Sequence, residues 1–257
     1  MKVKIFSKHN YGVLKKFEEA FNVTDAKNAD ICIAIGGDGT LIKAAQNFDG
    51  PILPIRSNEP GSVGFYADVG IEDVDKIIEL LTKKSYRIVE LSKKMRITYN
   101  GRKYYAVNEA LLKSSEQEVY FTLYRIKNGK SSRIYPFIMS GDGIIAATSV
   151  GSTAYNRSAN GPILLTDKVL CLTFLNTDGP YKNAMVFDSS EKIRVKIEKY
   201  NGLLEHDNKK IAILKPGESF DIEISGRKFL MVKLNGMNEP LEKKLERLVM
   251  GKTVKDI

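Results

Sequence analysis

The hydrophobic pattern changes once along the chain, near Tyr86, and this change restricts the possible folds more than any other feature. Before it, three apolar runs alternate with three segments whose apolar residues recur at helical spacing. The runs are residues 2–6, 30–35 and 51–55, and the segments are residues 11–21, 40–48 and 71–84. Continuous runs such as ICIAI are typical of strands buried on both faces of a parallel sheet. Residues 1–85 are therefore predicted to form a Rossmann-like α/β domain.

From residue 86 to 234 the apolar residues alternate with polar ones, as in YFTLYRIKNGK, KIRVKIEKY and SFDIEISG. Asn-Gly, Ser-Gly and Pro-Gly pairs separate these stretches and are typical of tight turns between strands. We therefore expect an all-β, sandwich-like second domain, interrupted by a short helix at SVGSTAYNRSANG. The last segment, 235–257, contains a charged helical pattern that is predicted to pack back on the first domain.

Several classes of protein are disfavoured by the composition. No apolar run approaches the ~18 residues of a membrane-spanning helix, and the N-terminus lacks the pattern of a signal peptide. Cys32 and Cys171 lie inside apolar runs, which suits a cytoplasmic protein. The net charge of +9 is spread among acidic residues, as in EKKLERLVMGK. We therefore expect no membrane or nucleic-acid partner, whereas small polyanions such as nucleotides suit a mildly positive surface.

The buried strand 30–35 ends in Gly36-Gly37-Asp38-Gly39-Thr40, and a helical segment follows. Ligands bind at this edge of open α/β sheets, and glycines let backbone N–H groups approach a phosphate. The turn is neither a Walker loop nor GxGxxG. Asp38 would repel a phosphate unless it takes a proton from a hydroxyl or holds a divalent metal. The alternative is that Asp38 only caps the helix.

Two further stretches concentrate polar groups where a core is expected. Asn108-Glu109 interrupts the apolar strand AVNEALL, either as a ligand-binding amide and carboxylate or as a bulge or solvated edge. Residues 140–165 are crowded with Gly, Ser, Thr and Asn and contain Tyr155, whose ring offers a flat face to a nucleotide base. A long ordered loop of this kind usually has a function, so we expect it to line a polar ligand groove rather than to be a loop without one.

Together, these three stretches resemble the NAD kinase family, ATP- or polyphosphate-dependent enzymes that phosphorylate NAD to NADP. The family has a GGDG turn, a short Asn-Glu or Asn-Asp pair, and a GSTAYxxSxxGP segment. Here they correspond to residues 36–39, 108–109 and 151–162. GGDGT alone is shared with lipid kinases and phosphofructokinases, whereas the third motif is more specific. The order of the motifs matches from Lys2 to about Leu234, and the family's α/β and β-rich domains agree with the pattern.

The resemblance implies a role for each matching position of the first domain. Asp38 would be the base near the 2′-hydroxyl of the adenosine ribose, and Gly37 and Gly39 would shape the phosphate turn. Phe65 resembles an aromatic residue that lies near NAD. Mg²⁺ or another divalent cation would be bound mainly through the ATP phosphates, without a metal site made by the protein.

The remaining positions belong to the second domain. Asn108 and Glu109 would hold the ribose and nicotinamide side of NAD. Asp142 resembles an acid that reaches the ligand of a neighbouring subunit, which implies a homo-oligomer, either a dimer or a tetramer. Asp207 aligns with an acid that the family places near the active centre. Four residues would line the dinucleotide site: Thr153, Ala154, Tyr155 and Ser158.

The chain departs from the family pattern at Thr148-Ser149-Val150, where the family usually has Thr-Pro-Thr or Thr-Pro-Ser, and at Asn208, where Gly is common. Substrate preference and oligomer contacts are the properties that these changes affect. Two rival functions have sequence features against them. A lipid kinase needs an apolar pocket, which GSTAYNRSANG does not suggest, and a non-catalytic NAD or NADP sensor has little use for Asp38. His206 could be a catalytic acid or base, with a pKa that Glu205 and Asp207 would raise if they lie close. We expect it instead to be a solvent-exposed loop histidine.

Overall fold

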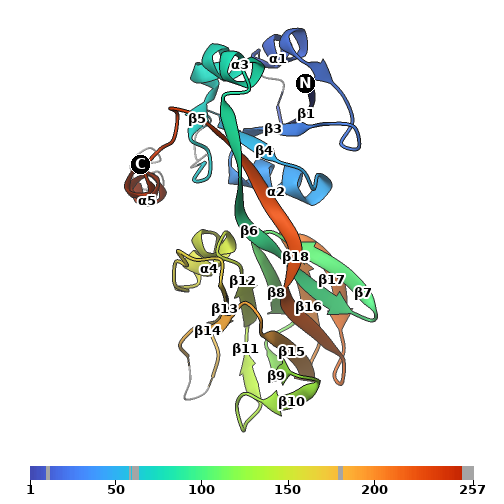
Figure 1. Cartoon of the computed structure of the whole chain (residues 1–257). Coiled ribbons are helices and arrows are strands. Elements are labelled where there is room, and N and C mark those ends of the chain that lie inside the picture. Colours follow the sequence, from blue (N-terminus) through green and yellow to red (C-terminus); the bar gives the residue numbers. More distant parts are fainter. Residues whose placement is uncertain (10–11, 58, 60–63, 179–181, 251–257) are drawn as a thin grey trace. The chain divides into compact units, whose positions relative to one another are not determined.

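The computed structural model describes residues 1–9, 12–57, 59, 64–178 and 182–250. The chain forms two compact units (Figure 1): a first unit made of residues 1–90 and 229–257, and a second unit made of residues 91–228. The boundaries between the units lie after residues 90 and 228, a few residues away from the predicted boundaries at 85 and 234. The reason is that two long strands, β6 (Tyr86–Tyr99) and β18 (Ser219–Leu234), each contain one of the division points.

The first unit is built on a parallel sheet in the order β2-β1-β3-β4, with β5 and the end of β18 both beside β4. Its strands are β1 (Lys2–Ser7), β2 (Asn22–Val23), β3 (Ile31–Gly36), β4 (Ile52–Arg56) and β5 (Val69–Gly70). Each strand of the predicted α/β layer is present within one or two residues of its expected place. The parallel arrangement brings the carboxyl ends of β3 and β4 to one edge.

Helices cover both faces of this sheet (Figure 1). They are α1 (Leu14–Ala20), α2 (Asp38–Asn47), the short 3₁₀ helix η1 (Ile71–Asp73) and α3 (Val74–Thr82). Ile31, Ile33 and Ile35 pack in one core cluster with residues of α1 and α3. Because side chains alternate along a strand, the buried Cys32 and Ala34 face the other side, where α2 lies. The predicted helix over 11–21 is shorter, and its Tyr11 lies outside the described residues.

The second unit is a sandwich of two antiparallel sheets. One sheet has the order β10-β9-β15-β18-β6-β7, with β11 also beside β9, and the other has the order β14-β13-β12-β8-β16-β17. The strands of the first of these sheets, besides β6 and β18, are β7 (Arg102–Ala106), β9 (Val119–Lys127), β10 (Lys130–Arg133), β11 (Met139–Gly141) and β15 (Lys192–Lys199). Those of the second are β8 (Glu109–Ser114), β12 (Gly143–Ala147), β13 (Val169–Leu175), β14 (Met185–Asp188), β16 (Gly202–His206) and β17 (Lys209–Leu214).

The core of the sandwich takes alternate residues from both sheets, such as Phe121 and Val195 from one and Leu112 and Leu172 from the other. The outer face of the second sheet has its own small apolar cluster around Ile145, which packs against residues of the 149–165 segment. That segment contains the 3₁₀ helix η2 (Gly151–Thr153) and the short helix α4 (Tyr155–Ser158), as its sequence predicts.

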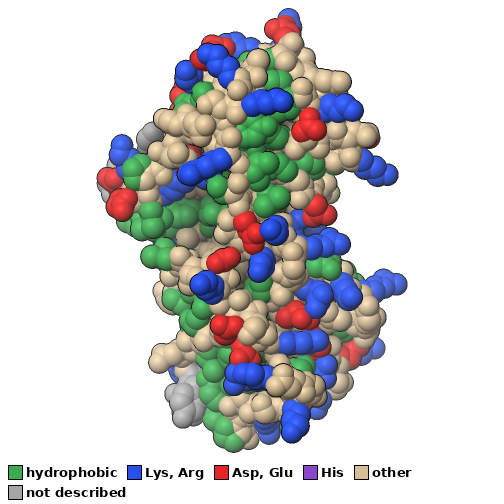
Figure 2. All heavy atoms as spheres, in the orientation of Figure 1, with side chains coloured by type: hydrophobic (Ala, Val, Ile, Leu, Met, Phe, Trp, Pro, Cys, Tyr) green, Lys and Arg blue, Asp and Glu red, His purple; other side chains and the backbone are tan. Residues whose placement is uncertain are grey.

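The predicted C-terminal helix is α5 (Leu241–Met250), and it packs on the first unit through Lys244 and Arg247. Residues 251–257 of the predicted C-terminal segment lie outside the described residues. No helix in the described part of the chain has the length and apolar character that a membrane crossing requires. On the face in Figure 2, Lys and Arg side chains are intermixed with Asp and Glu.

Candidate active site

Asp38 is the first residue of α2, directly after the carboxyl end of β3. Its carboxylate accepts hydrogen bonds from the backbone N–H groups of Phe65, at 2.9 Å, and Tyr66, at 3.3 Å. Gly37 occupies the N-cap position, and no side-chain cap is formed among the described residues of this helix. The alternative that Asp38 serves as a helix cap is therefore wrong, because its oxygens are directed to a separate loop.

The half-buried Asp38 has a pKa raised above its ordinary value, because burial removes water from the carboxylate. The two N–H donors and the positive charges of Arg247 and Lys244 act in the opposite direction and lower the pKa. A carboxylate with a raised pKa is a better proton acceptor than an exposed one. The site thus has, at the edge of the sheet, a carboxylate that is held in place and can accept a proton.

The glycines of the turn have different surroundings. A Cβ at Gly36, whose φ is +151°, would overlap the side chain of Thr40. Gly39 is exposed, and a Cβ there would meet no described atom within 4 Å. Packing against Thr40 therefore requires glycine at position 36, whereas the fold would accept a side chain at position 39.

Asn108 and Glu109 lie where β7 ends and β8 begins, so they do not interrupt a single strand as the sequence suggests. The carboxylate of Asp207 accepts the backbone N–H groups of Val107, at 2.7 Å, Asn108, at 2.8 Å, and Glu109, at 3.2 Å. Asp207 lies in the turn between β16 and β17, with a φ of 42°. The structure thus brings three predicted site residues together, and the Asp207 carboxylate holds the backbone of Asn108 and Glu109.

Glu109 is only 5% exposed, and its Oε2 atom has no hydrogen-bond partner among the described residues. Burial raises its pKa to about 8, and the negative charge of the neighbouring Asp207 adds to this increase. At neutral pH the side chain is therefore mostly a neutral carboxylic acid, which has a proton to donate.

A further set of contacts fixes the same turn from the other side. Thr148 donates from Oγ1 to the carbonyl of Val107, at 2.6 Å, and its own backbone N–H donates to the carbonyl of Asn108, at 2.9 Å. The N–H of Gly151 donates back to Thr148 Oγ1. A Cβ at Gly151 would overlap the backbone of Asn108, so only glycine permits this approach. The GST motif and the Asn-Glu pair are thus one packed assembly.

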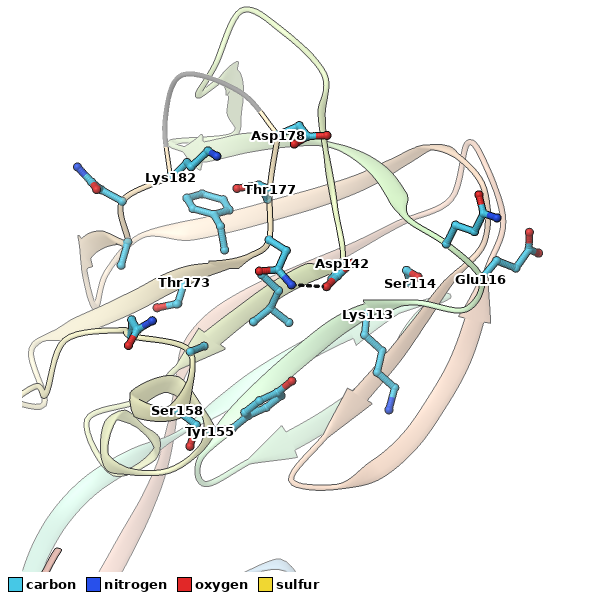
Figure 3. A pocket seen from close by; sticks show the side chains of 18 residues that line it. Lys113, Ser114, Glu116, Asp142, Tyr155, Ser158, Thr173, Thr177, Asp178 and Lys182 are labelled. Carbon is cyan, nitrogen blue, oxygen red and sulfur yellow. Dashed lines mark hydrogen bonds between the residues drawn. The ribbon is translucent and has the colours of Figure 1, made fainter. Parts of the chain in front are cut away.

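A pocket of about 1030 Å³ lies on the outer face of the second sheet, and it contains the predicted residues Asp142, Tyr155 and Ser158. Tyr155 is 45% exposed, and Figure 3 shows its ring and Ser158 on one side, with Asp142 across from them. Asn176 donates to the Asp142 carboxylate, at 2.6 Å. Thr153 is the last residue of η2, and Ala154 connects it to α4.

Some residues that build the site were missed by sequence reasoning. Asn156, fully buried, donates to the carbonyl of Pro162, at 2.9 Å, and accepts from Thr173, at 2.6 Å, which fixes α4 on the sheet. Asn156 stands at an unspecified position of the GSTAYxxSxxGP pattern, so the motif gave no signal for it. Lys113 and Asn176 also line the pocket, and neither belongs to a motif.

His206 differs from its expected surroundings. It is the last residue of β16, paired with Lys209 of β17 and Ala110 of β8, and it is half-buried. Burial lowers its pKa and outweighs the opposite effect of the Asp207 charge. The expectation of a solvent-exposed loop histidine is therefore wrong, and so is that of a pKa raised by its acidic neighbours.

No group of three or more His, Cys, Asp or Glu side chains that could hold a metal ion occurs in the described part of the chain. Both cysteines are buried, and burial raises the pKa of the Cys32 thiol to about 12. Neither thiol is therefore suited to nucleophilic chemistry.

Comparison with known proteins finds relatives of both parts of the chain. The family model for the ATP-NAD kinase N-terminal domain matches residues 2–86, and that for the ATP-NAD kinase C-terminal domain matches residues 125–234. The chain is 30% identical over 237 residues to an NAD kinase of Sulfurimonas denitrificans, covering 86% of this chain and 81% of the relative. It is 31% identical over 239 residues to an NAD kinase of Clostridium kluyveri, covering 86% and 80%.

Two solved structures share the fold at lower identity. An NAD kinase from Archaeoglobus fulgidus in complex with ATP superposes with a TM-score of 0.75 at 21% identity, over 96% of this chain and 99% of that one. Yeast NADH kinase complexed with NADH superposes with a TM-score of 0.79 at 15% identity, over 99% and 89%. With both family domains matched and relatives aligned over most of its length, the chain belongs to the NAD kinase family of enzymes.

Proposed function

We propose that the enzyme transfers the γ-phosphoryl group of ATP to the 2′-hydroxyl of the adenosine ribose of NAD, giving NADP and ADP. The observation that carries this proposal is the Asp38 carboxylate, which stands at the ligand-binding edge of the parallel sheet and is held by two loop N–H groups. Family membership supports the reaction class. The names of the two solved relatives, bound to ATP and to NADH, support the substrates.

In this mechanism Asp38 is the general base. The 2′-hydroxyl oxygen attacks the γ-phosphorus in line, its proton passes to the Asp38 carboxylate, and the bond from the γ-phosphorus to the ADP oxygen breaks. A positioned base of this kind contributes about 10²–10⁴-fold to the rate. The raised pKa of Asp38 makes the carboxylate a stronger acceptor for that proton.

The phosphates are assigned to the turn before α2. Gly37 and Gly39 leave the backbone N–H groups at the helix N-terminus open to an anion, and Gly39 is exposed. We assign the divalent cation, Mg²⁺ or another, to the ATP phosphates. There it would neutralise phosphate charge.

The dinucleotide is assigned to the second unit and Phe65. Asn108 and Glu109 would hold the ribose and nicotinamide side, with Glu109 able to donate a hydrogen bond as a neutral acid. Thr153, Ala154, Tyr155 and Ser158 would line the site. Asp142, in the pocket of Figure 3, would reach a ligand in a neighbouring subunit of a homo-oligomer.

The test is to incubate the purified protein with NAD, ATP and Mg²⁺ and to detect NADP with an NADP-specific dehydrogenase, with Asp38→Ala in parallel. We expect NADP from the wild type alone. Separate reactions with polyphosphate and with NADH establish the donor and acceptor range. NAD binding without NADP from any donor would contradict the proposal and favour a sensor.

A further inference from the structure

The C-terminal helix α5 holds the loop that binds Asp38. Arg247 donates from Nη2 to the carbonyl oxygens of Gly64, at 2.9 Å, and Ala67, at 3.3 Å. Its Nη1 donates to both carboxylate oxygens of Glu239, at 2.7 and 2.5 Å. The planar guanidinium is therefore fixed between an acid and two main-chain acceptors, an arrangement that suits arginine and not lysine.

A second contact ties α5 to the end of the same loop. Asp68 pairs with Lys244 of α5, at 2.5 Å, and with Lys233 of β18, at 2.6 Å. The three side chains are only 10–15% exposed. Removing one partner from a desolvated group of this kind leaves an uncompensated charge, which makes the contact costly to break.

The loop contacts Arg247 through its carbonyl groups and Asp38 through its N–H groups. Residues 64–67 form a turn in which the N–H of Ala67 donates to the carbonyl of Gly64, at 3.1 Å. The carbonyl groups at its two ends accept from Arg247, while the N–H groups of the two central residues, Phe65 and Tyr66, donate to Asp38. A displacement of the turn would therefore move the Asp38 carboxylate with it.

The charges around Asp38 come from the same helix. Arg247 and Lys244 are the cations that act on the carboxylate and lower its pKa. Arg247 is paired with Glu239 and Lys244 with Asp68, and Lys233 on β18 shares the latter acid. Arg56 of β4 packs against Gly64 and is paired with Glu72.

We propose that Arg247 is a positioning residue for phosphoryl transfer, which holds the turn 64–67 in the conformation that aligns the Asp38 carboxylate. This inference rests on the proposed role of Asp38 as the base. It adds to that proposal a residue of the C-terminal helix that acts through the turn 64–67.

The test uses Arg247→Gln and Arg247→Lys in the full-length protein, with Lys243→Gln as the matched control. Lys243 is an exposed cation on the same helix. We expect Arg247→Gln to lower kcat by about tenfold or more, because small misplacements of a catalytic group reduce turnover steeply. The KM for ATP should stay within about twofold of wild type, whereas the KM for NAD should rise, because the displaced turn also carries Phe65. The control should match the wild type.

The pH profile separates this role from a purely stabilising one. Asp38 must be ionised to accept a proton, and loss of the Arg247 charge raises its pKa. The acid limb of kcat should therefore move to higher pH in Arg247→Gln. Arg247→Lys keeps the charge but loses the two-nitrogen hydrogen bonding of the guanidinium. It should therefore retain the wild-type acid limb of the kcat profile and have a kcat between those of the wild type and Arg247→Gln. Hydrogen exchange at the amides of Phe65 and Tyr66 should be faster in Arg247→Gln.

Asp38→Asn and the Asp38→Asn/Arg247→Gln double variant complete the design. If Arg247 acts through Asp38, the double variant is no slower than Asp38→Asn alone. Wild-type kcat and acid limb in a folded Arg247→Gln protein, with Asp38→Asn inactive, would overturn this inference and leave the proposed function standing. An Asp38→Asn variant that keeps its activity would overturn the proposed role of Asp38, and with it the inference.

Discussion

Asp207 accepts a hydrogen bond of 2.8 Å from the backbone N–H of Asn108, a residue 99 positions earlier in the chain. The same carboxylate also accepts from Val107 and Glu109, so one acid organises the whole junction between β7 and β8. A comparison of motifs would assign Asp207 to ligand binding. In this structure its carboxylate instead supports Asn108 and Glu109, two candidate ligand-binding residues.

Asp207→Asn is expected to lower the free energy of unfolding by about 1–3 kcal/mol, because the amide NH₂ group then faces the buried N–H of Val107. Asn tolerates the positive φ of this position, so the turn itself is preserved. Urea unfolding at pH 6, where Glu109 is protonated, measures the loss. Asn208→Gly, an exposed change in the same turn, should shift stability by less than about 0.5 kcal/mol. Equal stability of the two variants would contradict this account.

Glu109 is expected to make stability depend on pH. Its pKa is about 8 in the folded protein against an ordinary value of 4.5, so the folded state retains a proton that the unfolded chain releases. The contribution of Glu109 to the free energy of unfolding should therefore be fully present below about pH 4.5 and be lost progressively as the pH rises to about 8. The loss corresponds to about 1.4 kcal/mol for each unit of the pKa difference.

Glu109→Gln removes this titration and keeps the shape of the side chain. Unfolding should be measured at pH 5.5 and 8.5. The free energy of unfolding of the variant should increase relative to that of the wild type as the pH rises. Glu116→Gln, at an exposed position of the same unit, should retain the wild-type pH dependence. A wild-type unfolding free energy that does not change across this interval would show that Glu109 is not held as a neutral acid.

Asp38→Asn is expected to lower turnover by at least about 100-fold while leaving the fold intact, because the amide cannot accept the hydroxyl proton. Steady-state kinetics should place the effect on kcat more than on KM. Asp75→Asn, an exposed acid paired with Lys16, is the control and should retain activity. A variant with most of its turnover left would show that another group, or water, takes the proton.

Gly39→Ala separates ligand binding from folding. Since a Cβ there meets no described atom within 4 Å, and alanine favours a helix, stability should stay equal or rise by up to about 1 kcal/mol. The methyl group would block close approach of a phosphate, and loss of one charged contact of about 1.5 kcal/mol should raise the KM for ATP about tenfold. Gly36→Ala should instead lose stability through its overlap with Thr40. An unchanged KM would place the phosphates elsewhere.

The fold was largely predictable because its signals are local. The apolar run of β3 and the helical spacing of α2 each lie within a dozen residues, and so does the glycine turn between them. The alternation of β9 and β15 likewise reports which side of each strand faces the core. In such stretches the backbone state and the burial pattern follow from neighbouring residues alone.

The support of the site was not predictable in this way. The partners of Asp38 are N–H groups of residues 65 and 66, which carry no side-chain signature. The segment that contains Arg247 was predicted to be a helix packed on the first domain, but its sequence does not indicate which charged residue makes the contact. The main-chain acceptors of Arg247 are nearly two hundred positions away. His206 was misjudged because its burial depends on pairing between β16 and β8. Contacts to the backbone across long sequence separations leave no periodicity to detect.

The first unit is discontinuous in sequence, and this has a consequence for synthesis on the ribosome. Met231 of β18 pairs with Ile52 of β4, and Val232 and Leu234 belong to the core of this unit. Residues 1–90 therefore emerge without the strand that borders β4, and they must wait for all of residues 91–228 to be translated. The second unit is continuous and can fold as soon as it emerges. The part of the chain that is made first is thus expected to be the part that finishes folding last.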